Sequence, residues 1–189
     1  HYNGMDLTFD ALTIIGINAF NGAKIKSLSA PLLERIGERA FGSVNFGTSM
    51  ELDLTFPKLT TIGNNAFDGA KIKSLSAPKV TSIGEGAFFT VNYDTLIELD
   101  LNFPELISVG AVAFKKANLK TLIVPKLSNG ESDTFAYTTV SSYAIMKREL
   151  NAITTSIVLK YHPEDTTFHL TLATKQQLKM EYQKRGTCA

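Results

Sequence analysis

The stretch LTTIGNNAFDGAKIKSLSAP, residues 59–78, repeats the stretch LTIIGINAFNGAKIKSLSAP, residues 12–31, with three differences in 20 positions. The segments that follow them, residues 32–57 and 79–104, match each other at 14 of 26 positions. The period is therefore 47 residues and consists of a short unit of 21 residues and a long unit of 26. Self-similarity at a fixed period of this length is typical of proteins built from stacked structural repeats.

Each unit carries a phenylalanine at one fixed position, which indicates a stacked apolar core. The column consists of Phe20, Phe41, Phe67, Phe88, Phe114 and Phe135. Between this phenylalanine and a closing proline, polar and apolar residues alternate, as in IKSLSA at 25–30 and ELDLTF at 51–56, which predicts a short strand. One strand per unit cannot form hairpins, so we expect parallel pairing between neighbouring units, with one coil per unit.

An Ile-Gly or Val-Gly pair precedes the phenylalanine in five units, at Gly16, Gly37, Gly63, Gly84 and Gly110. Since each glycine lies between a short β-like run and an expected helical turn, we predict a positive φ there. Residues 5–12 align with residues 52–59, again 47 positions later. The chain thus begins inside a long unit, and we expect further repeats upstream in the parent protein.

The repeat pattern weakens after Pro125. Residues 153–161 and 168–173 have strand character, and Thr174 is a suitable N-cap for an amphipathic helix over residues 175–185. A terminal unit must shield the core from water. We therefore divide the chain into repeats at 1–125 and degenerate repeats with a capping helix at 126–189; a separate functional domain at 126–189 is the alternative.

Composition excludes several functional classes. The 19 Lys+Arg against 18 Asp+Glu give a net charge of +1, too low for a protein that binds nucleic acid through its phosphates. No apolar run approaches the ~18 residues of a transmembrane segment. The single cysteine, Cys188, excludes an intrachain disulfide framework and a Cys-rich zinc site.

Two histidines, His162 and His169, lie close to Glu164 and Asp165, and all four are residue types that bind metals. Their spacing matches no zinc-protease or calcium-loop pattern, so we interpret the segment as a polar turn before a strand. No nucleophile motif is present either. We predict no catalytic residues, no metal site and no cofactor, and hence a protein that is not an enzyme.

The units closely resemble the BspA-like leucine-rich repeats, as LTTIGNNAFDGAKIKSLSAP at 59–78 and KVTSIGEGAF at 79–88 illustrate. The resemblance covers about residues 5–125. It implies an α/β fold: a right-handed leucine-rich repeat solenoid with a parallel β-sheet on one face and short helical turns. It also implies a secreted or surface-attached bacterial protein that acts in adhesion or protein binding.

The outward positions of the predicted strands form a ladder of small polar side chains. The ladder includes Ser27, Ser29, Asp53, Thr55, Ser74, Ser76, Asp100 and Asn102. One interpretation is solubility, because serines between the aspartates keep like charges apart. The other is a shallow polar surface that binds a partner protein or a glycan.

The long units contain an insertion relative to the short ones, SVNFGTSM at 43–50 and TVNYDTLI at 90–97. It places Phe46 and Tyr93 at equivalent positions. Insertions in repeat arrays form loops on one side, often the binding side. The two aromatic rings therefore either bind a partner or fold back over the edge of the core.

The function that fits these observations is a non-catalytic interaction or adhesion module of a secreted or surface protein. Its binding residues would be the strand face together with Phe46 and Tyr93. The partner would be a host or cell-surface protein, or a glycan, and not a nucleic acid. The alternative is a structural spacer in a larger surface protein, and the sequence leaves the oligomeric state open.

Overall fold

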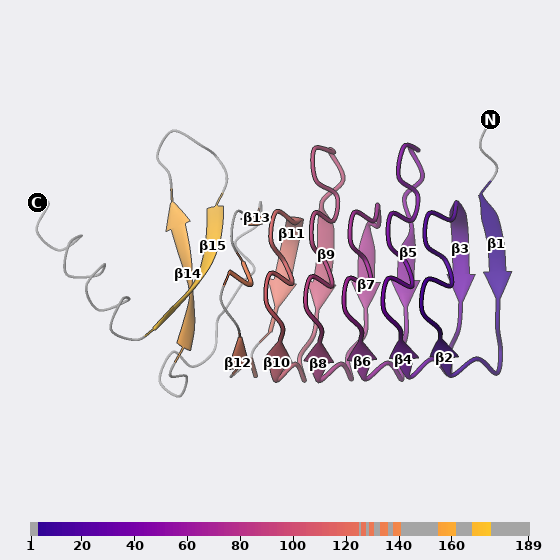
Figure 1. Ribbon diagram of the computed structural model, residues 1–189, viewed down its shortest axis with the longest axis horizontal. Helices are drawn as coiled ribbons and strands as arrows, with labels where there is room; N and C mark the ends of the chain where they lie inside the picture. The colour runs from indigo at the N-terminus through magenta and orange to yellow at the C-terminus, as the bar shows by residue number, and fades with distance from the viewer. Residues whose placement is uncertain are drawn as a thin grey trace, which may run out of the picture.

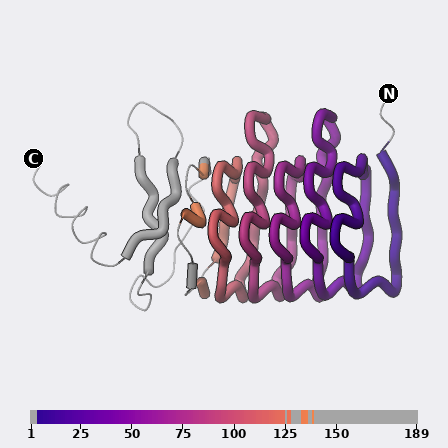
Figure 2. The backbone as a smooth tube through the Cα atoms, in the orientation of Figure 1, coloured from indigo at the N-terminus to yellow at the C-terminus, as the bar shows by residue number. Residues whose placement is uncertain are grey.

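The computed structural model describes residues 4–124, 126–127, 129–130, 133–135, 138–140, 155–161 and 168–174. The repeats form a row of stacked coils that advance along one axis (Figures 1 and 2). Each coil consists of a strand, a proline corner, a two-residue strand and a run of tight turns. The prediction of one coil per unit is confirmed.

The longer strands lie along one face of the row. They are β1 (Met5–Thr8), β3 (Ile25–Ser29), β5 (Asp53–Thr55), β7 (Ser74–Ser76), β9 (Leu99–Asn102), β11 (Asn118–Ile123) and β13 (Thr138–Val140). β1 pairs with β3, and β5 to β13 form one parallel run in a second sheet. The register places equivalent leucines beside one another, Leu54 on Leu75 and Leu75 on Leu101, as the repeat predicts.

A second row of parallel strands lies on another side of each coil. The prediction of a parallel sheet on one face was therefore incomplete. Its two-residue members are β2 (Ile14–Ile15), β4 (Arg35–Ile36), β6 (Thr61–Ile62), β8 (Ser82–Ile83), β10 (Ser108–Val109) and β12 (Asn129–Gly130). Five of the six lie just before the repeated glycines. The short β-like runs before the glycines are therefore strands. Runs this short show no alternating pattern, so the sequence did not predict that they pair into a second sheet.

The expected helical turns are not found, and the described residues contain strands and turns but no helix. In the first coil, three amides bond three residues back: Ala19 to Gly16, Asn21 to Asn18 and Ala23 to Phe20. The amides that alternate with these donate to carbonyl oxygens of the next coil: Asn18 to Glu38, Phe20 to Ala40 and Gly22 to Gly42. An α-helix would keep all of these bonds within one coil. The α/β class therefore needs correction to strands and turns in this part of the chain.

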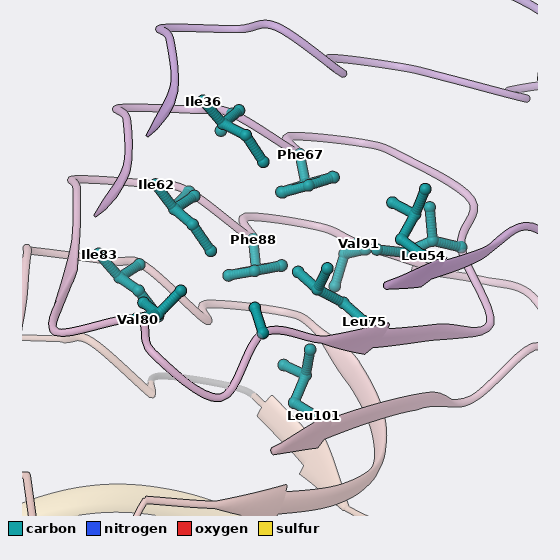
Figure 3. Close-up of a cluster of buried hydrophobic side chains, with 14 of the residues drawn as sticks. Ile36, Leu54, Ile62, Phe67, Leu75, Val80, Ile83, Phe88, Val91 and Leu101 are labelled. Atoms are coloured by element: carbon teal, nitrogen blue, oxygen red, sulfur yellow. The ribbon is translucent and has the colours of Figure 1, made fainter. Parts of the chain in front are cut away.

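The phenylalanine column forms the centre of the core, as predicted. Neighbouring rings from Phe20 to Phe135 lie 5.0–5.4 Å apart between centroids, with interplanar angles of 0–24°. Figure 3 shows Phe67 and Phe88 one above the other, between the isoleucines of the short strands and the leucines of the long ones. All rings of this column from Phe41 onward are buried.

The repeated glycines are required for a different reason from the one predicted. None of Gly16, Gly37, Gly63, Gly84 and Gly110 has a positive φ. Instead, a Cβ on Gly63 would lie 2.8 Å from the backbone carbon of Gly37 in the preceding coil. A Cβ on Gly84 would lie 2.8 Å from the same atom of Gly63. Glycine therefore allows the backbones of successive coils to touch.

The parallel run ends at an antiparallel pair of strands, β14 (Thr155–Tyr161) and β15 (Phe168–Thr174). β15 pairs antiparallel with β13. The two predicted strands in this region are confirmed, whereas the predicted helix at 175–185 lies outside the described residues. Within the described part of the chain, no helix has the length and apolar character needed to cross a membrane.

Substitution of Gly63 by alanine should destabilise the array by roughly 1–3 kcal/mol, because the added Cβ meets backbone that cannot move aside. Gly16 occupies the same place in the motif, but a Cβ there would have no neighbour within 4 Å. Gly16→Ala should therefore change the free energy of unfolding by less than about 0.5 kcal/mol. Urea denaturation of both variants tests this; equal losses would contradict the role of coil contact.

Candidate binding site

The two insertions form loops, residues 43–50 and 90–97, which we call the long-unit loops. They project beyond the edge of the coil stack, next to the starts of β5 and β9 (Figures 1 and 2). Each continues the tight turns of its coil, with positive φ at Ser43, Asn45 and Gly47 in the first loop. The second loop repeats this geometry at Thr90, Asn92 and Asp94.

A buried asparagine anchors the base of each loop. The Asn45 side chain accepts a hydrogen bond from the Ile25 amide (2.8 Å) and donates one to the Ile25 carbonyl (2.9 Å). Asn92 makes the same pair of bonds to Ile72, at 3.0 and 2.6 Å. Both asparagines are fully buried. Neither asparagine was among the predicted site residues, although their identical positions in the two long units were a usable signal.

The tips of the loops carry exposed apolar side chains. Phe46 is 65% exposed and Tyr93 49% exposed, and Leu96 near the second tip is fully exposed. The rings therefore do not fold back over the core edge, which was one of the two interpretations left open by the sequence. Leu96 was not among the predicted site residues, because Ser49 stands at its place in the first loop.

Side chains of the short units contact both loops, and at the first loop they do so from both sides. Lys24 donates through Nζ to the carbonyl oxygen of Phe46, and Lys71 donates to that of Thr48 (3.3 Å). At the second loop, Lys116 Nζ lies 5.6 Å from the centre of the Tyr93 ring, a cation–π distance. The loops are thus held by neighbouring coils as well as by their own turns.

The strand face divides into two columns with different hydrogen bonding. In the first column, each aspartate accepts a bond from a hydroxyl of the next coil: Ser27 to Asp6 (2.5 Å), Ser74 to Asp53 (2.5 Å) and Thr121 to Asp100 (2.8 Å). These groups therefore already bond to one another. The second column consists of Ser29, Thr55, Ser76 and Asn102, all exposed, whose side chains bond to no other described residue.

Three ionisable side chains have pKa values shifted by neighbouring groups or by burial. The Ser27 hydroxyl, with Lys26 beside it, holds the pKa of the Asp6 carboxyl below its usual value. The Glu51 carboxylate, 2.8 Å from Lys73, raises the pKa of that lysine. Partial burial raises the pKa of Asp68, opposed by a hydrogen bond from Thr90.

Among the described residues, no three His, Cys, Asp or Glu side chains come together as a metal site would require. His169 belongs to β15, while His162 and Cys188 lie outside the described residues.

The model for the BspA type Leucine rich repeat region matches the chain in six copies, over residues 13–142 and 60–169. The two ranges together span most of the chain. No curated protein matches it.

Asn92→Ala should destabilise the protein by about 2–4 kcal/mol, because it leaves both the amide and the carbonyl of Ile72 buried without partners. Tyr93→Ala, one residue further on, removes an exposed ring and should cost less than about 0.5 kcal/mol. Chemical denaturation of the two variants compares these values. A cost at Asn92 no larger than that at Tyr93 would show that the loop is not anchored in this way.

Asp68→Asn should stabilise the protein at pH 7. Because the folded-state pKa of Asp68 is raised above its unfolded value of 3.8, ionisation of this carboxyl costs stability as the pH rises through the folded pKa. Asparagine can still accept the Thr90 bond, and Asn21 occupies the equivalent position in the first short unit. Melting temperatures at pH 7 and pH 3.5 should show a gain that shrinks in acid. A less stable variant at pH 7 would contradict it.

Proposed function

We propose, since the chain belongs to the BspA-type leucine-rich repeat family, that it is a non-catalytic interaction module which binds a protein partner through its long-unit loops. The observation that carries this proposal is the exposure of Phe46 and Tyr93 on loops with buried anchors. Large apolar side chains that are held rigid in solvent lose little entropy when a partner covers them. The few residues that dominate the binding energy of protein interfaces are also enriched in tyrosine and tryptophan.

The second column of the strand face extends this site. Ser29, Thr55, Ser76 and Asn102 offer hydroxyl and amide groups that no described neighbour uses. They suit hydrogen bonds to a partner protein or to a glycan. Ser27, Ser74, Asp53 and Asp100 contribute less in this proposal, because they bond to one another across the coils or to their neighbours.

The same proposal includes the handedness of the coils, the role of residues 126–189 and the location of the protein. The coils would follow the right-handed path of a leucine-rich repeat solenoid, with residues 126–189 as degenerate repeats and a cap. The antiparallel strands β14 and β15 support a capping role, since β15 occupies the free edge of β13. The protein would be secreted or held at a bacterial surface and act in adhesion. The proposal assigns no catalytic residue and no cofactor.

The experiment is a binding screen of the purified chain against extracellular matrix proteins, whole cells and a glycan panel. Phe46→Ala/Tyr93→Ala should weaken a saturable protein interaction by roughly tenfold or more, as loss of two interface anchors does. Ile14→Ala/Ile17→Ala is the matched control, because these side chains are 55% and 69% exposed on another side of the coil.

Three outcomes count against the proposal. Equal binding by the loop variant would move the site away from the loops. Equal loss in both double variants would indicate a nonspecific apolar effect. No saturable partner at all would favour the alternative function, a spacer in a larger surface protein.

A further inference from the structure

We propose that the first long-unit loop, residues 43–50, recognises an acidic segment of the protein partner. This inference rests on the proposed function and adds the chemistry of the ligand. The site consists of Phe46 and the two lysines that flank its loop, Lys24 and Lys71.

The two ammonium groups converge on one loop. Lys24 donates to the carbonyl oxygen of Phe46, and Lys71 donates to the carbonyl oxygen of Thr48, two residues further on. Both lysines are half-buried, so their side chains are held against the loop rather than free in solvent. Each ammonium has donors left after one such bond, since it carries three.

Neither charge is neutralised within the described residues. The ion pairs of this edge use other lysines: Lys26 with Asp6, Lys73 with Glu51 and Lys120 with Asp100. Glu51, the acidic residue nearest in sequence to the loop, lies 2.8 Å from Lys73. Residues 43–50 themselves contain no Asp or Glu. A carboxylate from a partner would therefore meet two unneutralised cations beside an exposed ring.

The second long-unit loop has the same fold but different charges. Asp94 stands where the first loop has Gly47, and Asn118 stands where Lys71 does. Asn118 donates to the carbonyl oxygens of Thr95 and Ile97, both at 3.2 Å, and so makes the loop contact without a charge. The second loop is thus a version of the site with an acidic tip and one uncharged flanking contact, and its cation, Lys116, lies over the Tyr93 ring instead.

A protein fits this edge better than an anionic glycan or membrane. Phe46 is 65% exposed and Leu96 fully exposed, so the surface offers apolar area that a polyanionic glycan would leave uncovered. A membrane surface would have to touch the tips of both loops. Asp94 at the tip of the second loop would be repelled by the negative charge of anionic lipids. An acidic peptide with apolar side chains complements both features.

The matched variants are Gly47→Asp and Gly47→Asn. Nothing lies within 4 Å of a Cβ at Gly47, and its φ of 73° is close to the 53° that Asp94 adopts in the second loop. Asparagine tolerates the same backbone region. The two variants differ only in one charge, and their unfolding midpoints establish that both are folded.

The probe is a fluorescein-labelled copolymer of glutamate and tyrosine, titrated with the full chain and followed by anisotropy. Gly47→Asn should bind within about twofold of wild type, whereas Gly47→Asp should bind roughly tenfold more weakly, as expected from a like charge placed at a complementary site. Lys24→Asn/Lys71→Asn should lose affinity similarly, whereas Lys58→Asn/Lys79→Asn, with the same change in net charge, should not. Affinity should fall as salt is raised.

Equal affinities of Gly47→Asp and Gly47→Asn would overturn the inference. So would tighter binding to a copolymer of lysine and tyrosine; if that binding is lost in Phe46→Ala/Tyr93→Ala, the loops still bind a protein and only the charge assignment fails. Binding of equal strength to heparin or to phosphatidylserine vesicles would also overturn it, because the site would then recognise polyanions in general.

Discussion

Backbone contact between successive coils is the constraint on which the structure depends. The amides of Phe20, Phe41, Phe67 and Phe88 each donate to an alanine carbonyl of the next coil at 2.7 Å. The coils can come this close only because the repeated glycines have no Cβ. The same spacing places the phenylalanine rings 5.0–5.4 Å apart, so core packing follows from the backbone contact. It also explains the absence of helices from the described repeats, since alternate amides bond to the next coil.

The candidate site follows from the same constraint. A coil whose path is set by its neighbours cannot absorb the extra residues of a 26-residue unit, so these residues leave the stack as a loop. Backbone groups beside the base of each loop then need hydrogen-bond partners. Asn45 and Asn92 supply these hydrogen bonds from buried positions. Anchoring at the base leaves the tips free to hold Phe46 and Tyr93 in solvent.

Much of this architecture could be predicted from the sequence, because a period of 47 residues with one strand per unit permits little except parallel coils. The phenylalanine column identified the core for the same reason. The role of Gly63 and its equivalents could not be predicted, since a glycine required for positive φ and one required for close approach look identical in a sequence. The two-residue strands were too short to show periodicity. Asn45 and Asn92 resembled ordinary loop residues, although they are buried.

Hydrogen exchange by NMR at the amides of Phe20, Phe41, Phe67, Phe88 and Phe114 is the most direct test of coil contact. Each of these amides donates to the next coil at 2.7–2.8 Å. We predict that Phe41, Phe67 and Phe88 exchange slowly and at similar rates, because they open only when the stack opens. The amide of the exposed loop residue Leu96 should exchange much faster. Exchange at Phe67 and Phe88 as fast as at Leu96 would contradict the account.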